Sequence, residues 1–424
     1  MKDIAIYTLT SALHDEQSVA ASTHLFLSSL GIDYDMCGSD FSTYGQSILD
    51  LIYVRTGGAE NIFRQLLPQI QSSGKPVLLL TSGTNNSLAA SMEILSFLQQ
   101  NNMQGEILHG QPQYIIKRIS ELQQLAQARR KLQGCRLGVI GKPSDWLISS
   151  ATDYQIVHNK LGIELIDIPL DEIRKAIGDT AIDGGQQGAL RIYDALKQIV
   201  EKHNLQGFTL RCFDLLTELH NTGCLALARL NSEGLVASCE GDIPAMLSMT
   251  VVRALFGISG FQANPAHIDV ETGQILLAHC TIPLDMVERY EYDTHFESGI
   301  GVGIRGYMPA GPVTIFKLSG DITRHFVAEG QLLRCESRPN LCRTQAIVQF
   351  DNPAETKYFL TNPIGNHHIL LPGRPLRHRE FNDLDRLWAA REHHQGADGT
   401  KKKEFRLHKK KVISHFSPKL SIIS

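Results

Sequence analysis

Short apolar runs alternate with longer amphipathic stretches through the first third of the chain, and polar turns join them. The short runs have the length of buried strands, and the longer stretches are typical of helices. The predicted strands are 3–8, 32–36, 49–54 and 76–80, and the predicted helices are 17–30, 59–70 and one that begins at Ser87. Strand, turn and helix in repeated order predict an open parallel α/β sheet over residues 1–134, with ligands expected at the carboxyl ends of the strands.

A second α/β pattern follows a charged segment at 118–132, which itself predicts a linker helix. The strand pattern restarts at RLGVIG (136–141). Further strands are predicted at 162–168, 207–211 and 235–239, and further helices at 188–203 and 243–256. Together these segments predict a second parallel α/β domain over residues 135–259.

After residue 260 the pattern changes to short β-rich segments separated by glycine, proline, asparagine and aspartate, such as VTIFKL (313–318). Helical spacing is scarce in this region, which predicts a C-terminal β-barrel domain over residues 260–380. Residues 381–424 predict a terminal amphipathic helix followed by a basic, solvated tail. The predicted fold class is therefore two N-terminal open parallel α/β sheets followed by a C-terminal antiparallel β-barrel.

Composition narrows the class of protein without indicating an activity. Apolar residues make up 42% and charged residues 20% of the 424 residues, as in ordinary globular proteins. The net charge of −3 gives no electrostatic signature for a nucleic-acid or membrane partner. No apolar run approaches the roughly 18 residues that span a bilayer, and no secretory pattern opens the chain, so we expect a cytoplasmic protein. The eight cysteines include no CxxC pair and are expected to be reduced thiols.

Candidate chemistry gathers in three stretches, namely SCEGD (238–242), residues 260–298 and GNHH (365–368). Carboxylates and imidazoles together suit both divalent-cation binding and proton transfer near neutral pH. Glu240 follows a predicted buried strand, where an uncompensated carboxylate is costly, and this favours a ligand or a general base. Asp242 precedes a predicted helix, and helix capping is favoured there over metal ligation.

The middle stretch offers two further histidines. His279 ends an apolar strand, where it is either a ligand or a hydrogen-bonded core histidine. His295 and Glu297 are two residues apart, so in a strand they face the same side, which suits a shared site. Cys280 is interpreted as a buried thiol, because no paired base marks it as a nucleophile.

The adjacent pair His367 and His368 precedes a predicted strand. Adjacent strand residues face opposite sides, so at most one of the two should reach a given site, and the other is expected to make a supporting hydrogen bond. Arg305 and Lys317 are available to hold an anionic or hydroxyl-rich substrate. A solvated face explains each of these two cations equally well.

Four motifs in combination resemble the L-fucose isomerase and L-arabinose isomerase superfamily, in particular its shorter, fucose-isomerase-like branch: CEGDIPA (239–245), AHCTIP (278–283), THFESGIGVGI (294–304) and NHHI (366–369). The PSDW turn (143–146) agrees with it. The resemblance implies a sugar aldose–ketose isomerase that uses Mn²⁺, or another divalent cation such as Mg²⁺, Co²⁺ or Zn²⁺. It also implies a homo-oligomer, trimeric or hexameric, with the active site between domains and often between subunits.

The resemblance places the family's acidic position at Glu240, its late histidine motif at His367 and His368, and its mid-domain histidine near His295. The segment FQANP (261–265) departs from the family, because a second acidic ligand is expected there. In its place Asn264 would ligate through its carbonyl oxygen, and Asp269 is the weaker candidate. The predicted metal ligands are Glu240, Asn264, His279 and His368. The predicted catalytic residues are Glu240, His295 and Glu297, and the predicted substrate-binding residues are Asn264, Arg305 and His367.

Two alternatives to a sugar isomerase stay open. A sugar-binding or regulatory protein on the same scaffold is favoured by the missing carboxylate and disfavoured by the many ionisable groups at one site. A cysteine- or zinc-dependent hydrolase finds little support, since the chain has neither a nucleophile elbow nor an HExxH helix. The sequence leaves open which sugar is the substrate, and whether hydrogen moves through an enediol or as a hydride.

Overall fold

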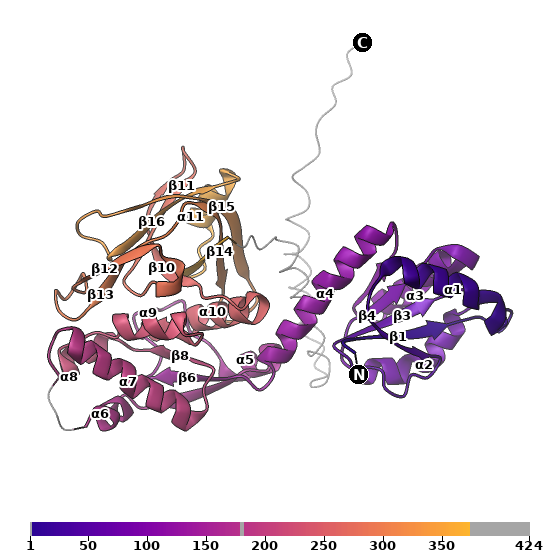
Figure 1. Ribbon diagram of the computed structural model, residues 1–424, viewed down its shortest axis with the longest axis horizontal. Coiled ribbons are helices and arrows are strands. Elements are labelled where there is room, and N and C mark those ends of the chain that lie inside the picture. Colours follow the sequence, from indigo (N-terminus) through magenta and orange to yellow (C-terminus); the bar gives the residue numbers. More distant parts are fainter. Residues whose placement is uncertain (1, 179–181, 374–424) are drawn as a thin grey trace, which may run out of the picture.

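The computed structural model describes residues 2–178 and 182–373 of the chain (Figure 1). Its first unit is a five-stranded parallel sheet in the order β2-β1-β3-β4-β5. The strands are β1 (Ile4–Leu9), β2 (Asp35–Gly38), β3 (Leu49–Val54), β4 (Val77–Leu80) and β5 (Gly105–Leu108). The helices are α1 (Glu16–Leu30), α2 (Glu60–Ser72), α3 (Ser87–Gln100) and a short 3₁₀ turn, η1 (Thr84–Asn86).

A long helix, α4 (Pro112–Leu132), leads from this sheet to the rest of the molecule. Pro112 occupies the first helical turn, where its missing N–H costs nothing, and three basic residues end the helix, where they complement its dipole. Figure 1 shows the first sheet at one end of α4 and the remaining elements at the other end. The helix begins six residues before the segment predicted at 118–132.

The second unit is a four-stranded parallel sheet in the order β7-β6-β8-β9. Its strands are β6 (Arg136–Ile140), β7 (Glu164–Ile168), β8 (Gly207–Leu210) and β9 (Val236–Cys239). Its helices are α5 (Tyr154–Leu161), α6 (Asp171–Ile177), α7 (Gln186–His203), α8 (Phe213–Leu219), α9 (Cys224–Ser232) and α10 (Ile243–Phe256).

The third unit is a closed six-stranded antiparallel barrel in the order β10-β11-β16-β15-β14-β17. Its strands are β10 (Phe261–Asp269), β11 (Gln274–His279), β14 (Gly311–Leu318), β15 (His325–Glu336), β16 (Thr344–Phe350) and β17 (His368–Pro372). A separate hairpin, β12 (Arg289–Asp293) with β13 (Gly303–Tyr307), follows the 3₁₀ turn η2 (Leu284–Met286). The helix α11 (Ala354–Thr361) precedes β17 and was not predicted.

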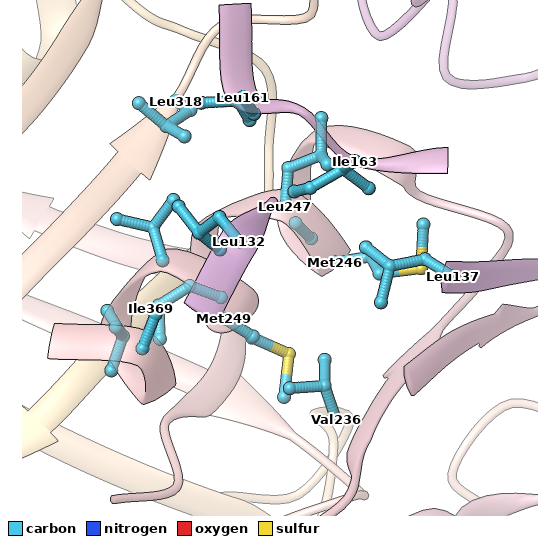
Figure 2. Close-up of a cluster of buried hydrophobic side chains, with 14 of the residues drawn as sticks. Leu132, Leu137, Leu161, Ile163, Val236, Met246, Leu247, Met249, Leu318 and Ile369 are labelled. Carbon is cyan, nitrogen blue, oxygen red and sulfur yellow. The ribbon is translucent and has the colours of Figure 1, made fainter. Parts of the chain in front are cut away.

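Helix α10 joins the second sheet to the barrel. Every residue from Ile243 to Val252 is buried, as expected of a helix that is apolar on all sides. Figure 2 shows Met246, Leu247 and Met249 of α10 in one cluster with residues from both neighbours, Leu137 of β6 and Ile369 of β17. Because α10 packs against both units, the turn that joins β9 to α10 is held at the boundary of the sheet and the barrel.

These observations confirm the predicted fold class of two parallel α/β sheets and an antiparallel barrel. The helix and tail predicted for 381–424 lie outside the described residues. Within the described ranges, no helix combines the length and apolar character needed to cross a membrane. All eight cysteines are free thiols, as predicted.

Candidate metal centre

Glu240 lies at the carboxyl end of β9, in a turn with unusual backbone angles. Its φ is +62°, in the left-handed region that non-glycine residues seldom adopt, and Gly241 follows with φ +59°. A Cβ on Gly241 would lie 2.9 Å from the carbonyl oxygen of Lys142, so the close approach of that loop also requires glycine. The Ser144 hydroxyl donates a hydrogen bond to the Glu240 carbonyl oxygen. A strained acidic residue held in place by its neighbours is typical of functional sites.

Two histidines from the barrel side face the Glu240 carboxylate. His279 is the last residue of β11, and His367 immediately precedes β17. The Oε1 atom of Glu240 lies 3.5 Å from His279 Nε2 and 3.4 Å from His367 Nε2. Both imidazoles are buried, and the Glu240 side chain is 13% exposed. One ligand atom from each of the three residues lies within 4.8 Å of the others, so three chain segments converge on one point.

The other nitrogen of each ring is also engaged. His279 Nδ1 is 2.8 Å from Thr281 Oγ1, and His367 Nδ1 is 2.8 Å from Asp242 Oδ2. Because a carboxylate only accepts, His367 Nδ1 donates to Asp242. This pattern, in which a carboxylate orients a histidine that faces a metal position, is common around protein metal ions.

Charge interactions within this cluster are strong because it is buried. Burial raises the pKa of Glu240, but the charges of His367 and His279 outweigh it and hold this pKa well below its usual value. Burial likewise opposes protonation of His367, yet Glu240 and Asp242 together raise the pKa of His367 to about 9. For Asp242, burial is outweighed by Lys317 and His367, and its pKa falls to about 2. A bound divalent cation would therefore take the place of the proton on His367.

The donor set fits a divalent cation. Separations of 3.4 and 3.5 Å are long for charge-assisted hydrogen bonds. They match the spacing of about 3.4 Å between two ligands that each lie about 2.1 Å from one tetrahedral ion. His367 Nε2 and Asn264 Oδ1 are buried and have no hydrogen-bond partner among the described residues, an arrangement that calls for an ion or water. One carboxylate and two imidazoles are acceptable ligands for Mn²⁺, Co²⁺ or Zn²⁺.

Two predicted catalytic residues lie on the loop between β12 and β13. His295 is buried, its Nδ1 is 3.0 Å from Ser298 Oγ, and its ring packs edge-on against Phe213 at 5.9 Å. Burial lowers the pKa of His295, although the charges of Glu297 and Glu240 oppose this shift. Glu297 itself is exposed. The structure thus places the imidazole of His295 within the electrostatic reach of Glu240.

The remaining predicted residues differ in their placement. Asn264 lies on β10 opposite Ala278, the residue before His279. His368 points away from Glu240: its ring packs against Phe359 at 4.5 Å, and its Nδ1 contacts the Asn366 carbonyl oxygen. Arg305 pairs with Asp293 across the β12–β13 hairpin. Asp269 caps a turn at the far end of β10, where it accepts from Glu271 N. Of the two adjacent histidines, it is therefore His367 that faces the cluster.

Two contacts were not anticipated from the sequence. Asp242 caps α10 as predicted, accepting from Ala245 N, but its second oxygen also binds His367 and lies 3.4 Å from Lys317 Nζ. Lys317 on β14 is only 1% exposed, so it does not belong to a solvated face. One oxygen of Asp242 caps the helix, which leaves the other oxygen available to residues far away in the sequence. No local sequence pattern identifies those residues.

The known proteins that are similar to this chain share one name. No protein-family model matches the chain. The chain is similar to the sulfoquinovose isomerase of Alkalicoccus urumqiensis, with 23% identity over 285 residues that cover 60% of this chain and 64% of that protein. The sulfoquinovose isomerases of Priestia megaterium and Clostridium sp. are 24% and 23% identical over 270 and 266 residues, which cover 60% and 59% of their lengths. The chain thus matches less than two thirds of the length of these relatives.

Proposed function

We propose that this chain is a divalent-metal-dependent aldose–ketose isomerase whose substrate is a sulfonated aldose. The observation that carries the proposal is the buried carboxylate of Glu240 faced by the Nε2 atoms of His279 and His367. The similarity to sulfoquinovose isomerases supports the reaction class and, through the name of their sugar, a substrate that carries a sulfonate. Two α/β sheets and a barrel also agree with the architecture that the L-fucose isomerase resemblance implies.

Glu240, His279 and His367 would hold the cation, with Asn264 Oδ1 as a further ligand or as a contact to the sugar. The ligand role predicted for His368 passes to His367, because His368 is turned into the aromatic core. When bound, Mn²⁺ or a similar ion would act as a Lewis acid on the carbonyl and hydroxyl oxygens of the sugar.

The side chains around the cluster supply the remaining requirements of the reaction. Isomerisation moves a hydrogen between C2 and C1 and a proton between the two oxygens, so a group that accepts and returns a proton is needed. His295 is suited to this role, because burial lowers its pKa and its Nε2 can accept a proton when Nδ1 donates to Ser298. Asp242 keeps His367 oriented, and Phe213 packs against His295 and, on its other side, against Trp146.

The direct test is an assay of purified protein with sulfoquinovose and added Mn²⁺, in which formation of the ketose is followed by NMR. We expect turnover that is lost on treatment with EDTA and regained when Mn²⁺ is restored. Binding of the sugar without any ketose formation would contradict an isomerase and favour the sugar-binding protein. Turnover that persists unchanged after complete removal of metal would contradict the metal site.

The assignment of the histidines can be tested with a matched pair of variants. We expect His279→Leu to lose bound metal, with affinity reduced at least about 100-fold, because it removes one of three ligands. We expect His368→Leu to keep one ion per chain, because its ring lies among Phe326 and Phe359 rather than at Glu240. Metal content after dialysis measures both, and equal loss in the two variants would refute this assignment.

A further inference from the structure

A cavity of about 420 Å³ lies beside the candidate metal centre. Its walls are the loop 146–150, the end of β14 with the turn after it (317–320), and residues 363–366. Residue 366 directly precedes His367, and Pro244, which also lines the cavity, comes two residues after Asp242. The cavity is therefore built from the same segments that position two members of the cluster.

The charges that line this cavity are all positive. Lys317 and Arg324 contribute the cations, and no aspartate or glutamate of the described chain belongs to the lining. Lys317 is 1% exposed, and its ammonium group has three N–H donors. Within residues 2–178 and 182–373 its one hydrogen bond is the long contact to Asp242 Oδ2, at 3.4 Å. A buried ammonium group with spare donors is stable only when an acceptor reaches it.

Hydroxyl groups gather at the same place. A Cβ placed on Gly365 would lie 3.4 Å from Ser150 Oγ, 3.8 Å from Ser149 Oγ and 3.8 Å from Lys317 Cε. Gly365 has φ +74°, so the residue without a side chain also suits the backbone at this position. Two hydroxyls and the methylene next to the Lys317 ammonium group thus lie around the missing Cβ of Gly365. Hydroxyl and ammonium donors on one wall of a cavity suit the several oxygens of a tetrahedral anion.

The cavity borders the candidate active site on two sides. Trp146 lines the cavity, its ring contacts Phe213 at 5.4 Å, and Phe213 in turn contacts His295 at 5.9 Å. On the other side, one oxygen of Asp242 links Lys317 to His367. These contacts place the cavity next to the residues that hold and flank the candidate metal centre.

We infer that this cavity binds the sulfonate group of the substrate through Lys317, Arg324, Ser149 and Ser150, and thereby selects anionic aldoses over neutral ones. The inference rests on the proposed function for the position of the reacting end of the sugar. Arg324 is exposed at the rim and offers a guanidinium that can bind two sulfonate oxygens, whereas Lys317 closes the bottom. A sugar phosphate presents the same kind of oxygens, so the experiment compares both anions.

The test compares kcat/KM for sulfoquinovose, for quinovose, which has a methyl group in place of the sulfonated carbon, and for glucose 6-phosphate. We expect the wild-type protein to have its highest kcat/KM with sulfoquinovose. In Arg324→Gln, the ratio of kcat/KM for sulfoquinovose to kcat/KM for quinovose should fall at least about tenfold, mainly because KM for the sulfonated sugar rises. The double variant Ser149→Ala/Ser150→Ala should lower the same ratio. Arg64→Gln on exposed α2 is the matched control and should keep the wild-type ratio.

Two outcomes would overturn the inference: an unchanged preference in both cavity variants, or an Arg324-dependent preference for glucose 6-phosphate over sulfoquinovose. If wild-type protein turns over neither sugar, the proposed function fails, and the cavity is then judged by binding alone. Calorimetric titration with sulfoquinovose and quinovose should still show at least tenfold tighter binding of the sulfonated sugar, and loss of that difference in Arg324→Gln. Equal binding of the two sugars by wild-type protein would refute the cavity assignment.

Discussion

Replacing Glu240 by Gln is expected to reduce kcat at least about 1000-fold and to abolish retention of the bound cation. The amide keeps the shape of the side chain but removes the negative charge that faces His279 and His367. The backbone of this turn is held by Ser144 and Gly241, which the substitution leaves in place. We therefore expect the variant to fold, with a far-UV circular dichroism spectrum like that of the wild type, and the loss to appear in kinetics and in metal content.

Glu271→Gln serves as the control for this prediction. Glu271 is an exposed carboxylate in the turn between β10 and β11, at the opposite end of β11 from His279. Its substitution removes the same charge from the chain without touching the cluster, so metal content should match that of the wild type. Wild-type turnover in Glu240→Gln would remove this carboxylate from the mechanism.

Replacing Asp242 by Asn is expected to destabilise the protein by about 3–5 kcal/mol, because it leaves Lys317 buried without its anionic partner and breaks the contact with His367. Asn retains the ability to cap α10, so the loss of capping contributes little. A change of this size should lower the melting temperature by several degrees or more. Thermal unfolding monitored by circular dichroism measures the effect.

The matched control is Asp153→Asn. Asp153 caps α5, accepting from the backbone N–H groups of Gln155 and Ile156, but it is exposed and, within residues 2–178 and 182–373, pairs with no buried cation. This substitution should cost less than about 1 kcal/mol. Equal destabilisation in the two variants would show that the charge of Asp242 does not hold Lys317 and His367 in place.

The fold was predictable because its periodicities are distinct. Buried strands followed by glycine-containing turns identified both parallel sheets, and the short β segments after residue 260 identified the barrel. Helix α11 escaped notice because it has only eight residues, with two of them, Thr356 and Phe359, buried. Helical periodicity that weak does not stand out from the surrounding β segments.

The candidate site was predictable where chemistry conflicts with burial. Glu240 was identified because a carboxylate at the end of a buried strand needs a partner. The choice between His367 and His368 could not be made, because alternation only places them on opposite sides without saying which side holds the metal. Lys317 was ambiguous because strand β14 is buried on both faces, with α10 packed against one of them through the Ser248–Leu318 hydrogen bond. In each of these cases the role of the side chain depends on contacts with residues that are distant in the sequence.

The central claim is that Glu240, His279 and His367 hold one divalent cation. Its most direct test is an anomalous difference map from crystals of the protein grown with Mn²⁺, recorded near the manganese absorption edge. We predict a single strong peak about 2.2 Å from a Glu240 carboxylate oxygen and from the Nε2 atoms of both histidines. The absence of a peak among these three residues at saturating Mn²⁺, or a strong peak bound only by other residues, would contradict the account.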